Sequence, residues 1–140
     1  MTARGNGWAS TTLDELGSGP GMRKLRTELH VTAFGINGMV LAPGTAGRWH
    51  WHDEQQEVYI VLRGELTIEF EHDAATTIGP GGVACVESST IRRLYNAGDV
   101  DVELVALGGK DGYVGRDGNL RDDELERLAD GEQGLIRPAE

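Results

Sequence analysis

Short apolar stretches recur along this chain, and Gly, Pro, Asp and Asn residues separate them. No helical period lies between these stretches, which favours an antiparallel barrel or sandwich made of short strands. The 21 glycines among 140 residues fit the many turns that an all-β fold needs. The predicted strands are Leu25–Leu29, Val31–Ile36, Met39–Leu41, Arg48–His52, Val58–Leu62, Leu66–Phe70, Ala75–Ile78, Val83–Glu87, Ile91–Tyr95 and Val102–Leu107.

The two ends of the chain differ from this central part. Residues 12–15 read T-L-D-E, which fits a capping box and predicts one helical turn that Gly17 ends. After residue 107 comes a glycine-rich loop, then a short acidic helix from Asp123 to Ala129. We therefore expect an N-terminal extension (1–24), a barrel (25–107) and a C-terminal loop and helix (108–140). The C-terminal tail is expected either to cap the barrel mouth or to pack against a partner subunit.

The clearest local unit is the pair of β-rich runs from Val58 to Phe70, which Arg63 and Gly64 join. This pattern predicts a hairpin. Side chains alternate between the two faces of a strand, so an inward Glu57 places Tyr59 and Val61 inward as well.

Charge and cysteine content limit the partners and the compartment. The net charge of −10 and the pI near 4.8 oppose contact with a phosphate backbone or an anionic membrane, so we expect neither nucleic acid nor membrane as a partner. The single cysteine, Cys85, cannot form an intramolecular disulfide and is predicted to be a small buried thiol. No signal-peptide-like or membrane-length apolar segment is visible, so the cytosol is the expected compartment.

The residues with the most chemical information lie between Gly44 and Gly64. His50 and His52 are one residue apart, so in a strand they share a face, and Glu57 follows five residues later. Two neutral imidazoles and a carboxylate suit a first-row divalent metal, and they leave coordination positions open for a ligand.

This spacing resembles the first motif of the cupin superfamily, G-x5-H-x-H-x(3,4)-E-x6-G, and it matches at all five fixed positions. The resemblance implies a small antiparallel jelly-roll β-barrel. It also implies that His50, His52 and Glu57 point into the bowl as metal ligands, with Fe, Mn, Ni or Zn as the candidate ions. Dimerisation is a further expectation from the family, and outward apolar strand faces with two outward tryptophans, Trp49 and Trp51, agree with a homodimer.

The second cupin motif, G-x5-P-x-G-x2-H-x3-N, is degraded in this chain. Gly81 and Asn96 match its ends, but Arg92 stands where the family has a fourth ligand, histidine. A guanidinium cannot ligate a metal, and it repels one. A unit charge pair at 4 Å is worth about 4 kcal/mol at an effective dielectric of 20, and a divalent ion facing Arg92 would be opposed by roughly twice that.

Three arrangements of Arg92 would relieve this repulsion. It could pair with Glu57 and replace the metal, it could turn toward the mouth and leave a two-histidine, one-carboxylate triad, or a substrate carboxylate could bridge it to the metal. The second and third arrangements predict a metal-binding pocket for a small anionic molecule, with oxygenase, isomerase or lyase chemistry if it is catalytic.

The first arrangement predicts a metal-free, non-catalytic binding or sensing module. A weaker alternative is a metal-free isomerase with a histidine base. In the metal-binding interpretation Arg92, Tyr59 and Asn96 contact the ligand, and no catalytic residue is assigned.

Overall fold

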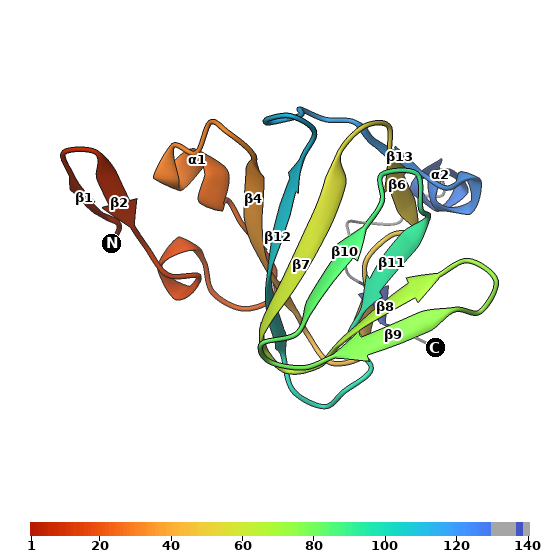
Figure 1. Ribbon diagram of the computed structural model, residues 1–140. Coiled ribbons are helices and arrows are strands. Elements are labelled where there is room, and N and C mark those ends of the chain that lie inside the picture. Colours follow the sequence, from red (N-terminus) through yellow and green to blue (C-terminus); the bar gives the residue numbers. More distant parts are fainter. Residues whose placement is uncertain (130–136, 139–140) are drawn as a thin grey trace.

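The computed structural model describes residues 1–129 and 137–138. Two antiparallel sheets face each other and form a jelly roll with open edges, and a small N-terminal hairpin stands away from them (Figure 1). The all-β jelly-roll prediction is therefore confirmed. None of the described helices is long and apolar enough to cross a membrane.

A five-stranded sheet forms one wall of the jelly roll. Its order is β10-β7-β12-β4-β3, and every neighbouring pair is antiparallel. The strands are β3 (Gly21–Arg23), β4 (Gly35–Leu41), β7 (Gln56–Arg63), β10 (Val83–Val86) and β12 (Val102–Gly109).

The second wall is a seven-stranded sheet in which β11 pairs with β5, β6 and β8. The strands are β5 (Thr45–Ala46), β6 (His50–His52), β8 (Leu66–Phe70), β9 (Ala75–Ile78), β11 (Arg92–Tyr95), β13 (Gly118–Leu120) and β14 (Arg137–Pro138). The N-terminal hairpin and the helices are β1 (Ala3–Gly5), β2 (Trp8–Ser10), the 3-10 turn Asp14–Leu16, α1 (Leu25–Leu29) and α2 (Asp122–Ala129).

The hydrophobic core lies between the two walls and follows from strand alternation. Tyr59 and Val61 of β7 are each 1 % exposed, while Leu62 beside them is 51 % exposed. Leu66 and Ile68 of β8 and Leu104 of β12 have no exposed surface. The inward parity predicted for Tyr59 and Val61 is therefore confirmed.

The predicted hairpin between β7 and β8 is wrong. β7 pairs with β10 and β12, whereas β8 pairs with β9 and β11, so the chain crosses from one wall to the other at Gly64. Gly64 has a φ of 73°, in the left-handed region that favours glycine. Alternating apolar runs around a glycine turn are common to hairpins and to crossings between sheets, so the sequence pattern could not separate the two.

Three local predictions also need correction. Leu25–Leu29 is the helix α1, not a strand, and His30 ends it in the left-handed conformation with a φ of 56°. The strand predicted for Val31–Ile36 begins only at Gly35, as the start of β4. Cys85 is exposed, because β10 turns Ala84 and Val86 inward and Cys85 outward.

The predicted elements at the two ends are present. The backbone N–H of Glu15 donates to Thr12 Oγ1 at 3.2 Å as the 3-10 turn begins, and α2 covers the predicted acidic helix. Both walls extend past residues 25–107, since β3 pairs with β4 and β13 pairs with β6.

The crossing at Gly64 gives a test of the fold. A Cβ at this position would collide with the carbonyl oxygen of Asp101 and would also hold an unfavourable φ. We predict that Gly64→Ala lowers the free energy of unfolding by more than the roughly 1–2 kcal/mol cost of a left-handed residue. Urea denaturation measures this change.

Two matched variants separate strain from collision. Gly81 has a φ of 83° and open space around its Cβ position, so Gly81→Ala should show the strain alone. Gly79 has open space and no positive φ, so Gly79→Ala should change stability least. Equal stability of all three variants would contradict the crossing at Gly64.

A candidate metal centre and its pocket

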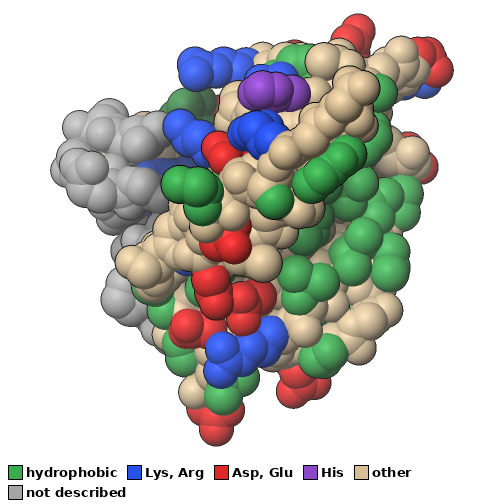
Figure 2. Space-filling view, turned by 90° about the vertical axis from the view of Figure 1, so that its left-hand side faces the viewer, with side chains coloured by type: hydrophobic (Ala, Val, Ile, Leu, Met, Phe, Trp, Pro, Cys, Tyr) green, Lys and Arg blue, Asp and Glu red, His purple; other side chains and the backbone are tan. Residues whose placement is uncertain are grey.

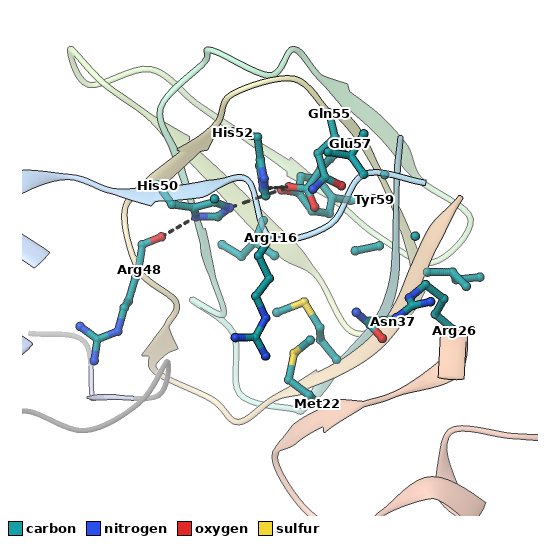
Figure 3. A pocket seen from close by; sticks show the side chains of 18 of the residues that line it. Met22, Arg26, Asn37, Arg48, His50, His52, Gln55, Glu57, Tyr59 and Arg116 are labelled. Carbon is teal, nitrogen blue, oxygen red and sulfur yellow. Dashed lines mark hydrogen bonds and ion pairs between the residues drawn. The ribbon is translucent and has the colours of Figure 1, made fainter. Parts of the chain in front are cut away.

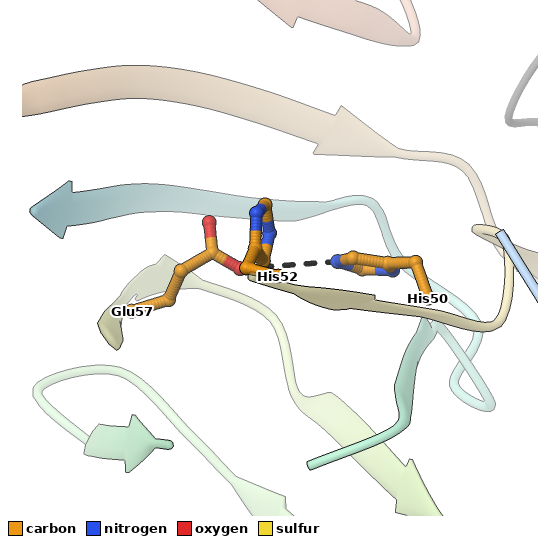
Figure 4. Close-up of side chains that lie close together, drawn as sticks. All are labelled: His50, His52 and Glu57. Carbon is orange, nitrogen blue, oxygen red and sulfur yellow. Dashed lines mark ion pairs between the residues drawn. The ribbon is translucent and has the colours of Figure 1, made fainter. Parts of the chain in front are cut away.

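Three potential metal ligands meet where the two walls face each other. His50 and His52 alternate on β6 and point inward, and Glu57 reaches them from the start of β7 (Figure 4). One ligand atom from each residue lies within 4.8 Å of the other two. All three side chains are partly buried. The structure thus brings together the three residues that the sequence motif singled out.

The outer nitrogen of each imidazole already has a partner. His50 Nδ1 lies 2.8 Å from the carbonyl oxygen of Arg48, and His52 Nδ1 lies 2.9 Å from Asp117 Oδ1. A carbonyl can only accept, and the carboxylate of Asp117 accepts as well, so both Nδ1 atoms carry the hydrogen. The lone pair of each Nε2 atom is then available inside the site. Metal-ligating histidines show this outer-shell arrangement.

Asp117 is the residue that holds His52 in place. Besides His52, it accepts hydrogen bonds from the backbone N–H groups of Glu54 and Gln55 at 2.9 Å, and from Gln55 Nε2 at 2.5 Å. Burial alone would raise the pKa of Asp117, but these bonds from Gln55, Glu54 and His52 hold that pKa well below its usual range. Sequence reasoning missed Asp117, because it lies 65 positions from His52 in a glycine-rich loop and no motif marks it.

Glu57 shares one oxygen among several neighbours. Its Oε1 accepts from Arg92 Nη2 at 2.5 Å and from the Tyr59 hydroxyl at 2.7 Å. Nε2 of His52 lies 3.1 Å away and Nε2 of His50 3.8 Å away. Burial would raise the pKa of Glu57, but the two histidines and Tyr59 together keep that pKa far below normal.

The contact between His52 and Glu57 needs a positive charge in or beside it. Since Nδ1 of His52 already donates to Asp117, its Nε2 lone pair would repel Glu57 unless a proton or a metal ion intervened. Burial lowers the pKa of His52, but the hydrogen bond and charge of Glu57, with help from Asp117, raise it overall. The position therefore favours a cation.

Arg92 lies inside the wall and not in the pocket. It has no exposed surface, its Nε donates to the Tyr59 hydroxyl at 3.3 Å, and its Nη2 donates to Glu57. Its Nη1 donates to three carbonyl oxygens, those of Glu87, Ser88 and Thr90, at 3.3, 3.3 and 2.9 Å. Of the three arrangements considered for Arg92, the pairing with Glu57 is the one observed.

Tyr59 and Asn96, the other two residues predicted to contact the ligand, lie in different places. Tyr59 lines the pocket, and burial together with the charge of Glu57 raises the pKa of its hydroxyl. Asn96 is fully buried: its Nδ2 donates to the carbonyls of Leu41 and Val100, and its Oδ1 accepts from Gly98. For Asn96 or Arg92 to contact a ligand, each would have to leave these partners.

A cavity of about 450 Å³ opens beside the three ligands, within the range of small-molecule sites (Figure 3). Three arginines line it: Arg26 of α1, Arg48 before β6 and Arg116 before β13. Apolar side chains supply much of the remaining wall: Met22, Ile36, Met39, Leu94, Val114 and Leu120.

The helix α2 is fastened to the wall of this cavity through a buried acid. Glu124 has no exposed surface; its Oε2 accepts from Arg48 Nη1 at 3.3 Å, and its Oε1 accepts from the backbone N–H of Trp49 at 3.3 Å. Trp49 packs against two arginine side chains. Its ring lies 5.0 Å from the guanidinium carbon of Arg93 and 4.4 Å from that of Arg121.

Comparisons with known proteins agree with this architecture. The family model described as "Cupin domain" matches residues 38–108. No curated protein matches the chain. A Klebsiella pneumoniae protein with a double-stranded β-helix domain superposes with a TM-score of 0.67 at 16% identity, over 79% of this chain and 95% of its own. A cupin protein from Bacteroides fragilis superposes with a TM-score of 0.63 at 18% identity, and the match covers 82% of this chain and 98% of that protein. A predicted oxalate decarboxylase from Thermotoga maritima superposes with a TM-score of 0.54 at 27% identity, and the match covers 62% of this chain and 76% of that protein.

The outer partner of His52 gives a test of the site. We predict that Asp117→Asn weakens binding of a divalent metal by about 10- to 100-fold, the usual effect of losing such a partner. The amide has one acceptor oxygen where the carboxylate has two, so His52, Glu54 and Gln55 can no longer all be satisfied. Competitive titration with a metal-binding dye measures the affinity. Asp99→Asn, an exposed change outside the site, is the control, and equal affinity in both variants would contradict the role of Asp117.

Proposed function

Because the chain belongs to the cupin family, we propose that His50, His52 and Glu57 hold one divalent transition metal and that the adjacent pocket binds a small anionic organic molecule. The observation that carries the proposal is the pair of engaged Nδ1 atoms, which leaves both Nε2 lone pairs beside the Glu57 carboxylate. The donor set of two imidazoles and one carboxylate fits Fe, Mn, Ni or Zn.

The residues have separate tasks in this proposal. His50, His52 and Glu57 bind the metal, the carbonyl oxygen of Arg48 and the carboxylate of Asp117 orient the imidazoles, and the Tyr59 hydroxyl donates a hydrogen bond to Glu57. A metal held there would polarise a substrate oxygen or activate dioxygen, the chemistry of oxygenases, isomerases and lyases. The Thermotoga maritima relative is named for oxalate, a small dicarboxylate, which supports an organic acid as the ligand.

One observation favours a second candidate, a metal-free binding or sensing cupin. The buried guanidinium of Arg92 lies against Glu57 and already compensates its charge. In that case Arg92 and Glu57 organise the bowl without a metal, and the pocket binds its ligand without turnover. We favour the metal because one divalent ion would satisfy the Nε2 lone pairs of both histidines together with Glu57, whereas a proton on His52 would leave the Nε2 lone pair of His50 without a partner.

We further propose a cytosolic homodimer that forms through the outer face of the five-stranded sheet. Ile60 of β7 lies directly between Val83 of β10 and Val105 of β12, and all three point outward. Val83 is 61 % exposed and Leu62 is 51 % exposed. Figure 2 shows hydrophobic side chains gathered along its right-hand side, where this wall lies in that view. A second copy of the chain would cover such a face.

Metal binding gives the first test. Dialysis against a chelator should lower the melting temperature, and added Zn, Mn, Ni or Fe should restore it with the dependence on concentration expected for a ligand of the folded state. His50→Ala combined with His52→Ala should abolish this response. His30→Ala combined with His72→Ala, two exposed histidines, is the control. Elemental analysis that finds no metal, together with no thermal response to any of the four ions, would favour the metal-free candidate.

The dimer has its own test. Val83→Lys places a charge on the proposed interface and should weaken self-association at least ten-fold in sedimentation experiments. Val100→Lys makes the same change at a loop position that is 48 % exposed, and it should leave association unchanged. A monomeric parent protein at all concentrations would refute this part of the proposal.

A further inference from the structure

The pocket wall is rich in positive charge, although the whole protein is negatively charged. The whole chain carries a net charge of −10, yet three arginines line the cavity, and Glu57 is the one acidic side chain among its described lining residues. Glu57 is already compensated by Arg92, and Arg48 is compensated by Glu124. Arg26 and Arg116 remain.

These two arginines have no acidic partner among the described residues. The guanidinium of Arg26 stacks on the ring of Tyr113, with its carbon 4.1 Å from the ring centroid, and stacking leaves its edge donors free. Arg116 has no ion pair or hydrogen bond with any described residue. Figure 3 shows Arg116 extending across the cavity toward Met22, while Arg26 lies beside Asn37 on the side away from His50.

Apolar side chains line much of the same cavity. They are Met22, Ile36, Met39, Leu94 and Leu120. A ligand that satisfies both regions needs an oxyanion at one part and an apolar body beside it. Arginine forks match a carboxylate through paired hydrogen bonds, and such charge-assisted bonds are stronger than neutral ones.

We propose that Arg26 and Arg116, not Arg92, form the anion-binding part of the pocket, and that the ligand is an organic acid with a carboxylate joined to an apolar body. This inference rests on the proposed function in taking this cavity as the ligand pocket. It does not require the metal, because neither arginine contacts His50, His52 or Glu57 in any described hydrogen bond or ion pair.

The test uses the full chain and straight-chain acids as probes. Butanoate, pentanoate and hexanoate are titrated by calorimetry at fixed ionic strength, alongside their primary amides. We expect the acids to bind at least ten-fold more tightly than the amides, the loss expected when one charge-assisted hydrogen bond is missing. We also expect affinity to rise roughly four-fold for each added methylene, because the apolar wall buries it.

Variants test whether the preference for acids depends on Arg26 and Arg116. Arg26→Gln combined with Arg116→Gln should remove the preference for acids and keep the dependence on chain length. Arg63→Gln, the same change at a position that is 64 % exposed at the end of β7, should change neither. Equal binding of amides by the parent protein, or an acid preference that survives in the double variant, would overturn the inference.

The same titrations on the His50→Ala, His52→Ala variant separate this inference from the proposed function. If that variant binds no metal and keeps an acid preference that depends on Arg26 and Arg116, the inference stands apart from the metal site. If the parent protein binds metal normally but shows no acid preference, the metal proposal stands and the inference fails.

Discussion

The ion pair between Glu57 and Arg92 joins the two walls of the jelly roll directly below the candidate metal centre. Glu57 belongs to the five-stranded sheet and Arg92 to the seven-stranded sheet, and their contact is 2.5 Å long. Arg92 also donates to three carbonyl oxygens between residues 87 and 90, so the turn before β11 depends on the same side chain. Breaking a buried pair of this kind typically costs about 3–5 kcal/mol, because one charge is left without compensation. The Glu57–Arg92 pair therefore contributes to the stability of the fold as well as to the candidate site.

This pair also explains how an arginine can occupy the place of a fourth metal ligand. The guanidinium is saturated by Glu57, Tyr59 and the three carbonyls, so it lies in the wall and not in the pocket. A metal ion bound by two neutral imidazoles and this carboxylate would then carry excess positive charge, to which Arg26 and Arg116 add. In the proposed function, an anion entering the pocket would balance that charge. The proposed metal and the proposed anion would therefore each favour binding of the other, although the protein as a whole is acidic.

The sequence predicted what depends on short-range patterns. The spacing of His50, His52 and Glu57 determined which side chains share a face, and strand alternation placed Tyr59 inside. Contacts between distant segments were not predictable. The crossing at Gly64 has the same local pattern as a hairpin, and the helical conformation of Leu25–Leu29 depends on packing that buries Leu25. The saturation of Arg92 by backbone carbonyls and the role of Asp117 also depend on tertiary contacts that no motif encodes.

Both histidines are oriented from outside the segment that the family model matches, which ends at residue 108. Asp117 accepts directly from His52. Glu124 acts on His50 through one peptide unit: it accepts from the N–H of Trp49, and the C=O of that same planar unit, from Arg48, accepts from His50 Nδ1. The barrel supplies the ligands, and the C-terminal segment from Asp117 to Glu124 fixes the direction of their rings. Because Arg116 directly precedes this segment, one stretch of chain orients the candidate metal ligands and also supplies part of the positive charge at the pocket.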